Sequence, residues 1–267
     1  MFIEFSFSCY CPSGVIVTAI GVFVATRWEL AAVRQAFAAS EMRVVGGIRC
    51  VVAQQGQVEW WVIPMGVGPE RATATARRVL AEQSFAAVWS TGFACALGPA
   101  GIGEVLIGTQ VTMEDGREAG RPVPCAPVFV DWVRQAVQEQ RLPVQSGRFV
   151  TVPRVLCRAE EKQEIARRAG GIGLDMESAA LGFVTLERNI PFVIVRTTSD
   201  LVDESLPLDF NLFLRPSGWV KGVAACLAHP TSLSGLNRLR VQSRIAGTQL
   251  TAVFRACADK ALREGLA

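Results

Sequence analysis

Two short segments place acidic side chains where a buried strand meets solvent: Leu174–Ala180, which contains Glu177, and Val195–Asp200, which ends on Asp200. A carboxyl group in such a place can give up or take a proton, and it can accept hydrogen bonds from a bound ligand. The alternatives are structural, because an aspartate after a strand often caps a helix and a glutamate in a first helical turn is favoured by the helix dipole. Two carboxyls on neighbouring strand ends favour a ligand site.

The elements between these segments decide where the two carboxyls lie. Apolar residues at helical spacing over Ser178–Arg188 predict a helix, and Pro191–Val195 is a continuous apolar run typical of a buried parallel strand. A strand–helix–strand crossover is right-handed in nearly all cases, so both strands point the same way. Glu177 and Asp200 are therefore predicted at one carboxyl edge of the sheet, where open α/β sheets bind ligands.

Strand-like and helical runs alternate along the rest of the chain, without a long linker, an internal repeat or a low-complexity tract. The alternation predicts an α/β fold, a three-layer α/β/α sandwich around a central, mostly parallel or mixed sheet, with residues 1–267 forming one domain. Residues 1–12 are an extension without a clear pattern, and 234–267 form a C-terminal helical segment. The other predicted strands are 14–24, 58–65, 86–91 and 104–113, and the other predicted helices are 70–83, 129–141, 220–228 and 234–262.

Composition and charge exclude several classes of protein. The 27 basic and 24 acidic residues give a net charge of +3 without a Lys/Arg run, which argues against a nucleic-acid partner. The eight cysteines are scattered through apolar contexts without zinc-like spacing, so we expect no metal and reduced thiols in a cytoplasmic protein. The apolar run Gly14–Val24 is too short to span a membrane. The only histidine, His229, lies far from the two carboxyls and leaves a Ser/His/Asp mechanism without a base.

Two runs of small residues follow strands and can bring the backbone close to a ligand. Gly66-Val67-Gly68 stands between a strand and a helix, as an anion-binding turn does, but the third glycine of a dinucleotide fingerprint is missing and a structural turn is equally compatible. Gly92, Phe93 and Ala94 let a flat ligand approach the backbone, although small residues also permit close helix packing. Their place at the carboxyl end of a strand favours the ligand.

Together and in this order, these segments resemble the nucleoside phosphorylase/nucleosidase superfamily. Its members cleave the N-glycosidic bond of nucleosides and include purine nucleoside phosphorylases and methylthioadenosine/S-adenosylhomocysteine nucleosidases. The resemblance covers roughly residues 15–205. The tail, at Leu214–Gly218 and Ala228–Pro230, is similar to the hopanoid-associated branch of the superfamily. That branch is implicated in removing adenine from adenosylhopane. The matching motifs of the superfamily are Gly66–Gly68 with Ala72, Thr91–Ala94 through Gly103–Val105, Asp175–Ala180 and Arg196–Asp200.

The resemblance implies a role for each carboxyl. Cleavage of the bond between ribose C1′ and purine N9 develops oxocarbenium character on the sugar and negative charge on the base, so it needs an acid at the base and a polar clamp on the sugar. Asp200 would protonate or hydrogen-bond purine N7, and Glu177 would accept hydrogen bonds from the 2′- and 3′-hydroxyls. Met176 would pack on the sugar face. The remaining substrate contacts implied are Ser199, Gly92, Phe93 and Ala94.

The group that attacks C1′ has two candidates in the segment Arg27-Trp28-Glu29. Nucleosidases of the family carry a water-activating glutamate in this region, which Glu29 would match, whereas phosphorylases carry a phosphate-binding arginine, which Arg27 would match together with Gly68. The arginine that phosphorylases supply before the glycine turn is absent at Val88–Thr91, which favours hydrolysis. Cys95-Ala96 replaces the paired glycines usual in that turn.

We therefore expect a nucleosidase that releases the free base from an adenine nucleoside or a 5′-substituted adenosine, with adenosylhopane among the candidate substrates. The alternatives are a purine nucleoside phosphorylase, with phosphate as co-substrate, and a non-catalytic nucleoside-binding homologue. The resemblance implies a homo-oligomer and no cofactor. The basic helix with Arg238, Arg240 and Arg244 is predicted to pack on the sheet or on a subunit partner, with peripheral membrane contact as the alternative if the substrate is a lipid.

Overall fold

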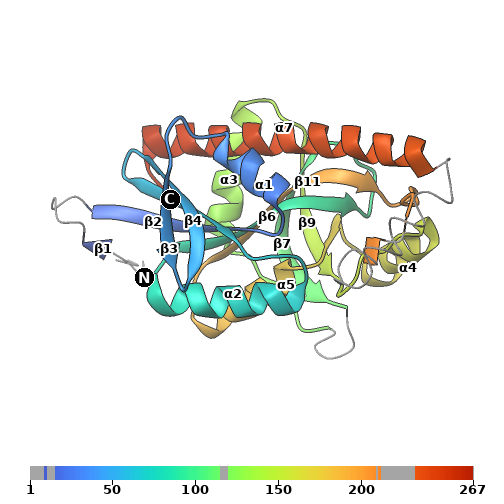
Figure 1. Ribbon diagram of the computed structural model, residues 1–267, viewed down its shortest axis with the longest axis horizontal. Coiled ribbons are helices and arrows are strands. Elements are labelled where there is room, and N and C mark those ends of the chain that lie inside the picture. Colours follow the sequence, from blue (N-terminus) through green and yellow to red (C-terminus); the bar gives the residue numbers. More distant parts are fainter. Residues whose placement is uncertain (1–8, 11–15, 115–119, 209, 212–231, 267) are drawn as a thin grey trace.

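The computed structural model describes residues 9–10, 16–114, 120–208, 210–211 and 232–266, and it has the predicted α/β fold (Figure 1). The helix predicted at 220–228 and the tail motifs at 214–218 and 228–230 lie outside the described residues. The strands are β1 (Cys9–Tyr10), β2 (Ile16–Val24), β3 (Glu41–Val45), β4 (Ile48–Gln55), β5 (Val58–Pro64), β6 (Ala87–Ala96), β7 (Val105–Met113), β8 (Val123–Pro124), β9 (Val144–Thr151), β10 (Gly173–Asp175) and β11 (Phe192–Leu201). The helices are α1 (Arg27–Arg34), α2 (Pro69–Glu82), α3 (Pro127–Glu139), α4 (Ala159–Ala169), α5 (Ser178–Glu187) and α7 (Ser232–Glu264).

One mixed sheet runs through the described residues, in the order β10-β9-β7-β11-β6-β2-β5-β4-β3, with β1 beside β2 and β8 beside β7. Its centre is parallel: β2 pairs with β5 and β6, and β6 pairs with β11. The short strand β10 is parallel to β9 and also pairs antiparallel with β6. Strands β6, β11, β7, β9 and β10 therefore close into a ring, a feature that the expectation of an open sheet did not include.

Helices cover both faces of the sheet. Figure 1 shows α7 along one side of the molecule with α1 and α3 beside it, and α2 and α5 on the opposite side. The long helix α7 buries one stripe of small and apolar side chains in the core: Ala246, Leu250, Val253, Phe254 and Cys257. This helix therefore packs against the sheet. Within the described part of the chain, no helix is long and apolar enough to cross a membrane.

An aromatic cluster fills the core between the parallel strands and α7. The rings of Trp60 in β5 and Trp89 in β6, two strands that both pair with β2, meet edge to face with centroids 5.4 Å apart and an interplanar angle of 87°. Phe254 of α7 packs on both rings, at 6.2 and 6.0 Å. Edge-to-face pairs of this kind add about 0.5–1.5 kcal/mol each to the burial of their area. The cluster holds α7 against β5 and β6.

The carboxyl ends of the parallel strands lie together at one edge. In the β6–β11 pair, Arg196 stands beside Gly92 and Asp200 beside Cys95, and a bulge between Thr198 and Asp200 places one extra residue in β11. A bulge bends its strand and re-aims the side chains next to it. The ends of β2, β5, β10 and β11, together with the last residues of β6, frame the site described next.

Candidate active site

A pocket of about 220 Å³ opens at this edge of the sheet. Its wall contains most of the residues singled out from the sequence, which come from four different segments: Glu29, Phe93, Ala94, Met176, Glu177, Ser199 and Asp200. Other parts of the wall had not been predicted: Arg154, Val155, Leu156, Lys162, Arg196 and Leu206. The structure thus brings both predicted carboxyls and Glu29 to one cavity.

Glu29 is buried at the start of α1, where it completes a capping box with Thr26. Its Oε2 accepts hydrogen bonds from the backbone N–H groups of Ala25 (3.0 Å) and Thr26 (2.7 Å) and from the Thr26 hydroxyl (3.0 Å). Its Oε1 accepts one bond, from the backbone N–H of Phe93 at 2.8 Å. Each carboxylate oxygen can accept about two hydrogen bonds, so Oε1 retains an acceptor position. The pattern Thr26-x-x-Glu29 was a readable signal of this cap.

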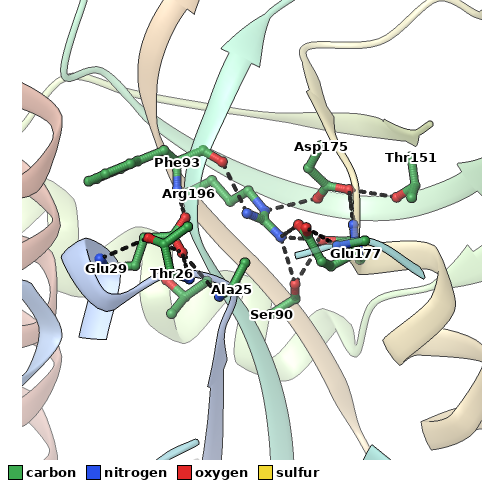
Figure 2. A network of polar contacts seen from close by, with 12 residues as sticks. Ala25, Thr26, Glu29, Ser90, Phe93, Thr151, Asp175, Glu177 and Arg196 are labelled. Atoms are coloured by element: carbon green, nitrogen blue, oxygen red, sulfur yellow. Dashed lines mark hydrogen bonds and ion pairs between the residues drawn. The ribbon is translucent and has the colours of Figure 1, made fainter. Parts of the chain in front are cut away.

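Gly92 makes room for the Glu29 carboxylate. Its φ of +139° lies in a region that side-chain-bearing residues rarely adopt, and a Cβ at this position would stand 2.1 Å from Glu29 Oε1. Figure 2 shows Glu29 lying between the start of α1 and the backbone of Phe93. Gly92 and the Phe93 N–H therefore contact the carboxylate, and the substrate contacts expected of Gly92 and Phe93 stay predictions.

Glu177 precedes the first turn of α5 and is buried. The backbone N–H of Gly68 donates to its Oε1 at 2.9 Å, and the Arg196 guanidinium lies 3.6 Å from its Oε2. Burial raises the pKa of Glu177 to about 7; the charge of Arg196 opposes this shift and the charge of Asp175 adds to it. Glu177 therefore lies at the pocket wall as a carboxyl that titrates near neutral pH.

A buried polar network centred on Arg196 connects the two glutamates (Figure 2). Arg196 Nε forms an ion pair with Asp175 Oδ2 at 2.9 Å, and its other nitrogens donate to the Phe93 carbonyl (3.0 Å) and to Ser90 Oγ (3.1 Å). Asp175 Oδ1 in turn accepts from the Thr151 hydroxyl at 2.6 Å. A buried charge is tolerated only when it is paired and hydrogen-bonded in this way. The network fixes the backbone at Phe93 and the side chain of Glu177.

Asp200 follows the bulge in β11, and its side chain is 15% exposed. The Ser199 hydroxyl donates to Oδ1 at 3.0 Å, and the ammonium of Lys162 donates to Oδ2 at 2.6 Å. Lys162 belongs to α4 and is buried. Sequence reasoning had selected Asp200 and Ser199 but not Lys162.

A family model described as the phosphorylase superfamily matches residues 19–215. The chain belongs to the phosphorylase superfamily. It is similar to the 5′-methylthioadenosine/S-adenosylhomocysteine nucleosidase of Staphylococcus aureus (strain JH9), with 28% identity over 164 residues that cover 56% of this chain and 72% of the relative.

Solved structures share the fold of this superfamily member. Futalosine hydrolase of Helicobacter pylori strain 26695 superimposes with a TM-score of 0.69 at 17% identity, over 89% of this chain and 97% of that one. The 5′-methylthioadenosine/S-adenosylhomocysteine nucleosidase from Neisseria meningitidis, in complex with methylthio-immucillin-A, gives a TM-score of 0.68 at 17% identity, over 90% and 99%. Family and relatives confirm the expectation of an enzyme that acts on nucleosides, and at a general level they support N-glycosidic cleavage.

The two residues expected to bind phosphate, Arg27 and Gly68, lie outside the pocket wall that contains Glu29. Arg27 is exposed, and its guanidinium lies 4.9 Å over the ring of its neighbour Trp28. Gly68, with a φ of +97°, is the N-cap residue of α2 and donates its N–H to Glu177. Neither belongs to the wall of the pocket.

The residues that depart from the family's glycine turn, Cys95 and Ala96, continue strand β6. Burial, and next the charge of Asp200, raises the pKa of the Cys95 thiol well above its usual value, so the thiol is neutral where it lines the pocket. Within the described ranges, no group of three or more His, Cys, Asp or Glu side chains is arranged to hold a metal ion. The carboxyls in the pocket wall are those of Glu29, Asp175, Glu177 and Asp200.

Proposed function

We propose that this protein is a nucleosidase, which hydrolyses the N-glycosidic bond of an adenine nucleoside or 5′-substituted adenosine with water as the nucleophile. The observation that carries this proposal is the buried Glu29, which lines the pocket and has an acceptor position left on Oε1. A carboxylate held by four hydrogen bonds is oriented before substrate arrives, which is what a positioned general base requires.

The competing proposal, attack by phosphate, needs a cation that can hold the anion. The cationic side chains in the pocket wall are Arg154, Lys162 and Arg196. Each already pairs with a carboxylate: Arg154 with Glu161 at 2.6 Å, Lys162 with Asp200 at 2.6 Å, and Arg196 with Asp175 at 2.9 Å. Phosphate binding would have to compete with these ion pairs, whereas a water molecule needs only the Glu29 carboxylate. This difference favours hydrolysis.

The proposed reaction uses three carboxyl groups. The water oxygen bonds to C1′ as the C1′–N9 bond breaks, and the water proton passes to Glu29. The electron pair of the broken bond goes to the purine, which takes a proton at N7 from Asp200. Glu177 accepts hydrogen bonds from the ribose hydroxyls and stabilises the positive charge that develops on the sugar. Proton exchange with solvent then returns Glu29 and Asp200 to their starting states.

The preference for adenine is supported by the main chain at Val155, in the same wall. Its N–H donates to Asn211 Oδ1 at 2.9 Å, and its carbonyl accepts from Asn211 Nδ2 at 2.9 Å. Adenine presents the same pattern as this carboxamide, an acceptor at N1 and a donor at N6, whereas hypoxanthine presents a donor at N1. If adenine displaced Asn211, its N1 would accept from the Val155 N–H and its N6 would donate to the Val155 carbonyl. Hypoxanthine would leave one of these backbone groups unpaired.

The test is the release of free base from adenosine, inosine, methylthioadenosine, S-adenosylhomocysteine and an adenosyl-lipid, each with and without phosphate. We expect release from adenine nucleosides without phosphate, and little from inosine. The adenosyl-lipid decides whether the substrate is a hopanoid precursor, which the motifs outside the described residues suggest. Release that requires phosphate would instead identify a phosphorylase, and binding without release would identify the non-catalytic homologue.

Two variants of neighbouring residues serve as a matched pair in the same assay. Glu29→Gln removes the general base and should lower kcat by about 10²-fold or more. Arg27→Ala changes a side chain that lies on Trp28 outside the pocket, and it should leave phosphate-independent kcat and KM within about twofold. A loss in Arg27→Ala that depends on phosphate would contradict the hydrolytic proposal.

A further inference from the structure

Lys162 is an unusual lysine because its charge is buried beside the pocket. Its side chain is 1% exposed, and its ammonium has three partners: Asp200 Oδ2 at 2.6 Å, the Glu204 carbonyl at 2.9 Å and the Leu201 carbonyl at 3.3 Å. An ammonium has three protons to donate, so every donor of Lys162 is used. The lysine cannot turn toward another partner without leaving a buried donor unpaired.

The same contacts restrict Asp200. Lys162 holds Oδ2, and the Ser199 hydroxyl donates to Oδ1. The bulge before Asp200 has already removed it from the regular alternation of β11. A carboxyl with both oxygens engaged has one orientation toward the cavity, and that orientation depends on a side chain from α4, more than thirty positions away in sequence.

The groups around the Lys162–Asp200 ion pair described here carry negative charge or none, so Lys162 is the cation bound to Asp200. From β6, the neutral thiol of Cys95 faces the carboxyl. From the segment after β11, the Glu204 carboxylate accepts hydrogen bonds from Gln242 of α7, at 3.0 and 3.1 Å. These neighbours would add negative charge or none, so the ammonium is what balances a carboxylate at this position.

We propose that Lys162 is a positioning residue for the glycosidic cleavage: it holds Asp200 in its orientation and compensates the negative charge that Asp200 acquires. This inference rests on the proposed function. When the carboxyl proton moves to purine N7, the electron pair of the O–H bond stays on Asp200 as a carboxylate. Lys162 keeps its three protons throughout, and its charge stabilises that carboxylate in the transition state.

Buried lysines also serve packing and fold specificity, so the test of this role needs a second buried lysine as a control. The chain offers a matched comparison in Lys260 of α7, whose ammonium is also buried and pairs with Glu139 at 3.2 Å and Glu264 at 2.7 Å. Neither carboxylate belongs to the pocket wall. A substitution at Lys260 removes a buried ammonium and its ion pairs, to carboxylates that are 40% and 51% exposed, without touching Asp200.

The experiment measures base release as a function of pH for wild type, Lys162→Met, Lys162→Arg, Asp200→Asn, Lys162→Met/Asp200→Asn and Lys260→Met. We expect Lys162→Met to lower kcat at its optimum about 10–100-fold, to change KM by less than about threefold, and to change the pH dependence of kcat. Lys162→Arg, which keeps the charge, should recover most of the loss. Lys260→Met should retain the wild-type profile.

The double variant separates a role through Asp200 from an independent one. If Lys162 acts through Asp200, Lys162→Met should cost little further activity once Asp200 is asparagine. Full additivity, an unchanged pH profile in Lys162→Met, or an equal loss in Lys260→Met would overturn the inference. Wild-type protein that releases no base from any nucleoside would overturn the proposed function instead, and the inference with it. An active wild type with a Lys162→Met variant of equal kcat would overturn the inference alone.

Discussion

The two ends of the pocket hold their carboxyls by different means. At one end, Glu29 and Glu177 are held mainly by backbone N–H groups, those of Ala25, Thr26, Phe93 and Gly68, with Arg196 behind them. At the other end, Asp200 is held by two side chains, Lys162 and Ser199. Main-chain donors persist through substitution as long as the local backbone persists. A single side-chain substitution near Asp200 can therefore change the catalytic chemistry alone. A substitution near Glu29 or Glu177 is expected to disturb the fold as well.

The largest effect should come from the acid itself. Asp200→Asn keeps the shape of the side chain but cannot donate an acidic proton to N7, so we expect kcat to fall about 10³-fold or more while binding of the nucleoside is retained. Glu29→Gln should cost less kcat but more stability, because an amide cannot accept from all the donors of the capping box. Rates of base release and thermal melts of both variants check this contrast. Activity retained in Asp200→Asn would show that another group is the acid.

A smaller loss should follow when the space for Glu29 is filled. Gly92→Ala would place a Cβ 2.1 Å from Glu29 Oε1 at a φ of +139°, so either the carboxylate or the β6 backbone must move. We expect a loss of about 1–3 kcal/mol in the free energy of unfolding, together with a fall in kcat. Gly98→Ala is the control, since Gly98 lies just after the same strand and a Cβ there meets nothing within 4 Å. Equal behaviour of the two variants would contradict the assigned role of Gly92.

The last test concerns Glu177 and the pH dependence of stability. Burial raises its pKa from an ordinary value of 4.5 to about 7, so the folded protein holds a proton that the unfolded chain releases. The contribution of this group to stability is complete below pH 4.5 and is lost as the pH rises through 7, by up to about 3 kcal/mol. The free energy of unfolding, measured with denaturant, should therefore fall less in Glu177→Gln than in wild type as the pH rises through this range. Glu187→Gln, at an exposed glutamate paired with Arg77, should decline as wild type does.

The sequence was sufficient for the elements around the site because their patterns are strong. The apolar run before Asp200 and the helix after Glu177 are β11 and α5, and the runs at 58–65 and 86–91 fall within or near β5 and β6. Each carboxyl could be placed at a strand end from these patterns alone. The combination of motifs then indicated the superfamily, because several strand ends that carry the matching residues are far more specific than any single one.

Lys162 and the closure of the ring could not be predicted, for physical reasons. Helix α4 is rich in Glu, Lys and Arg, so Lys162 looks like one more residue of a solvated face, and only the fold buries it. Strand β10 has three residues, too few for a periodic pattern, yet it joins β9 to β6. Arg196 and Asp175 belong to the recognised motifs, but their ion pair could not be predicted because it depends on how β10 and β11 are placed relative to each other in the fold.

The extra residue of the bulge in β11 determines the direction in which the Asp200 side chain points. Thr198 pairs with Ala94 and Asp200 with Cys95, so Ser199 is the one residue that the neighbouring strand does not match. Deleting Ser199 would substitute nothing at Asp200 or Lys162, yet it would return the end of the strand to simple alternation and carry the carboxyl out of reach of the ammonium. In this protein the acid is thus specified as much by an extra position in the chain as by the identity of any side chain.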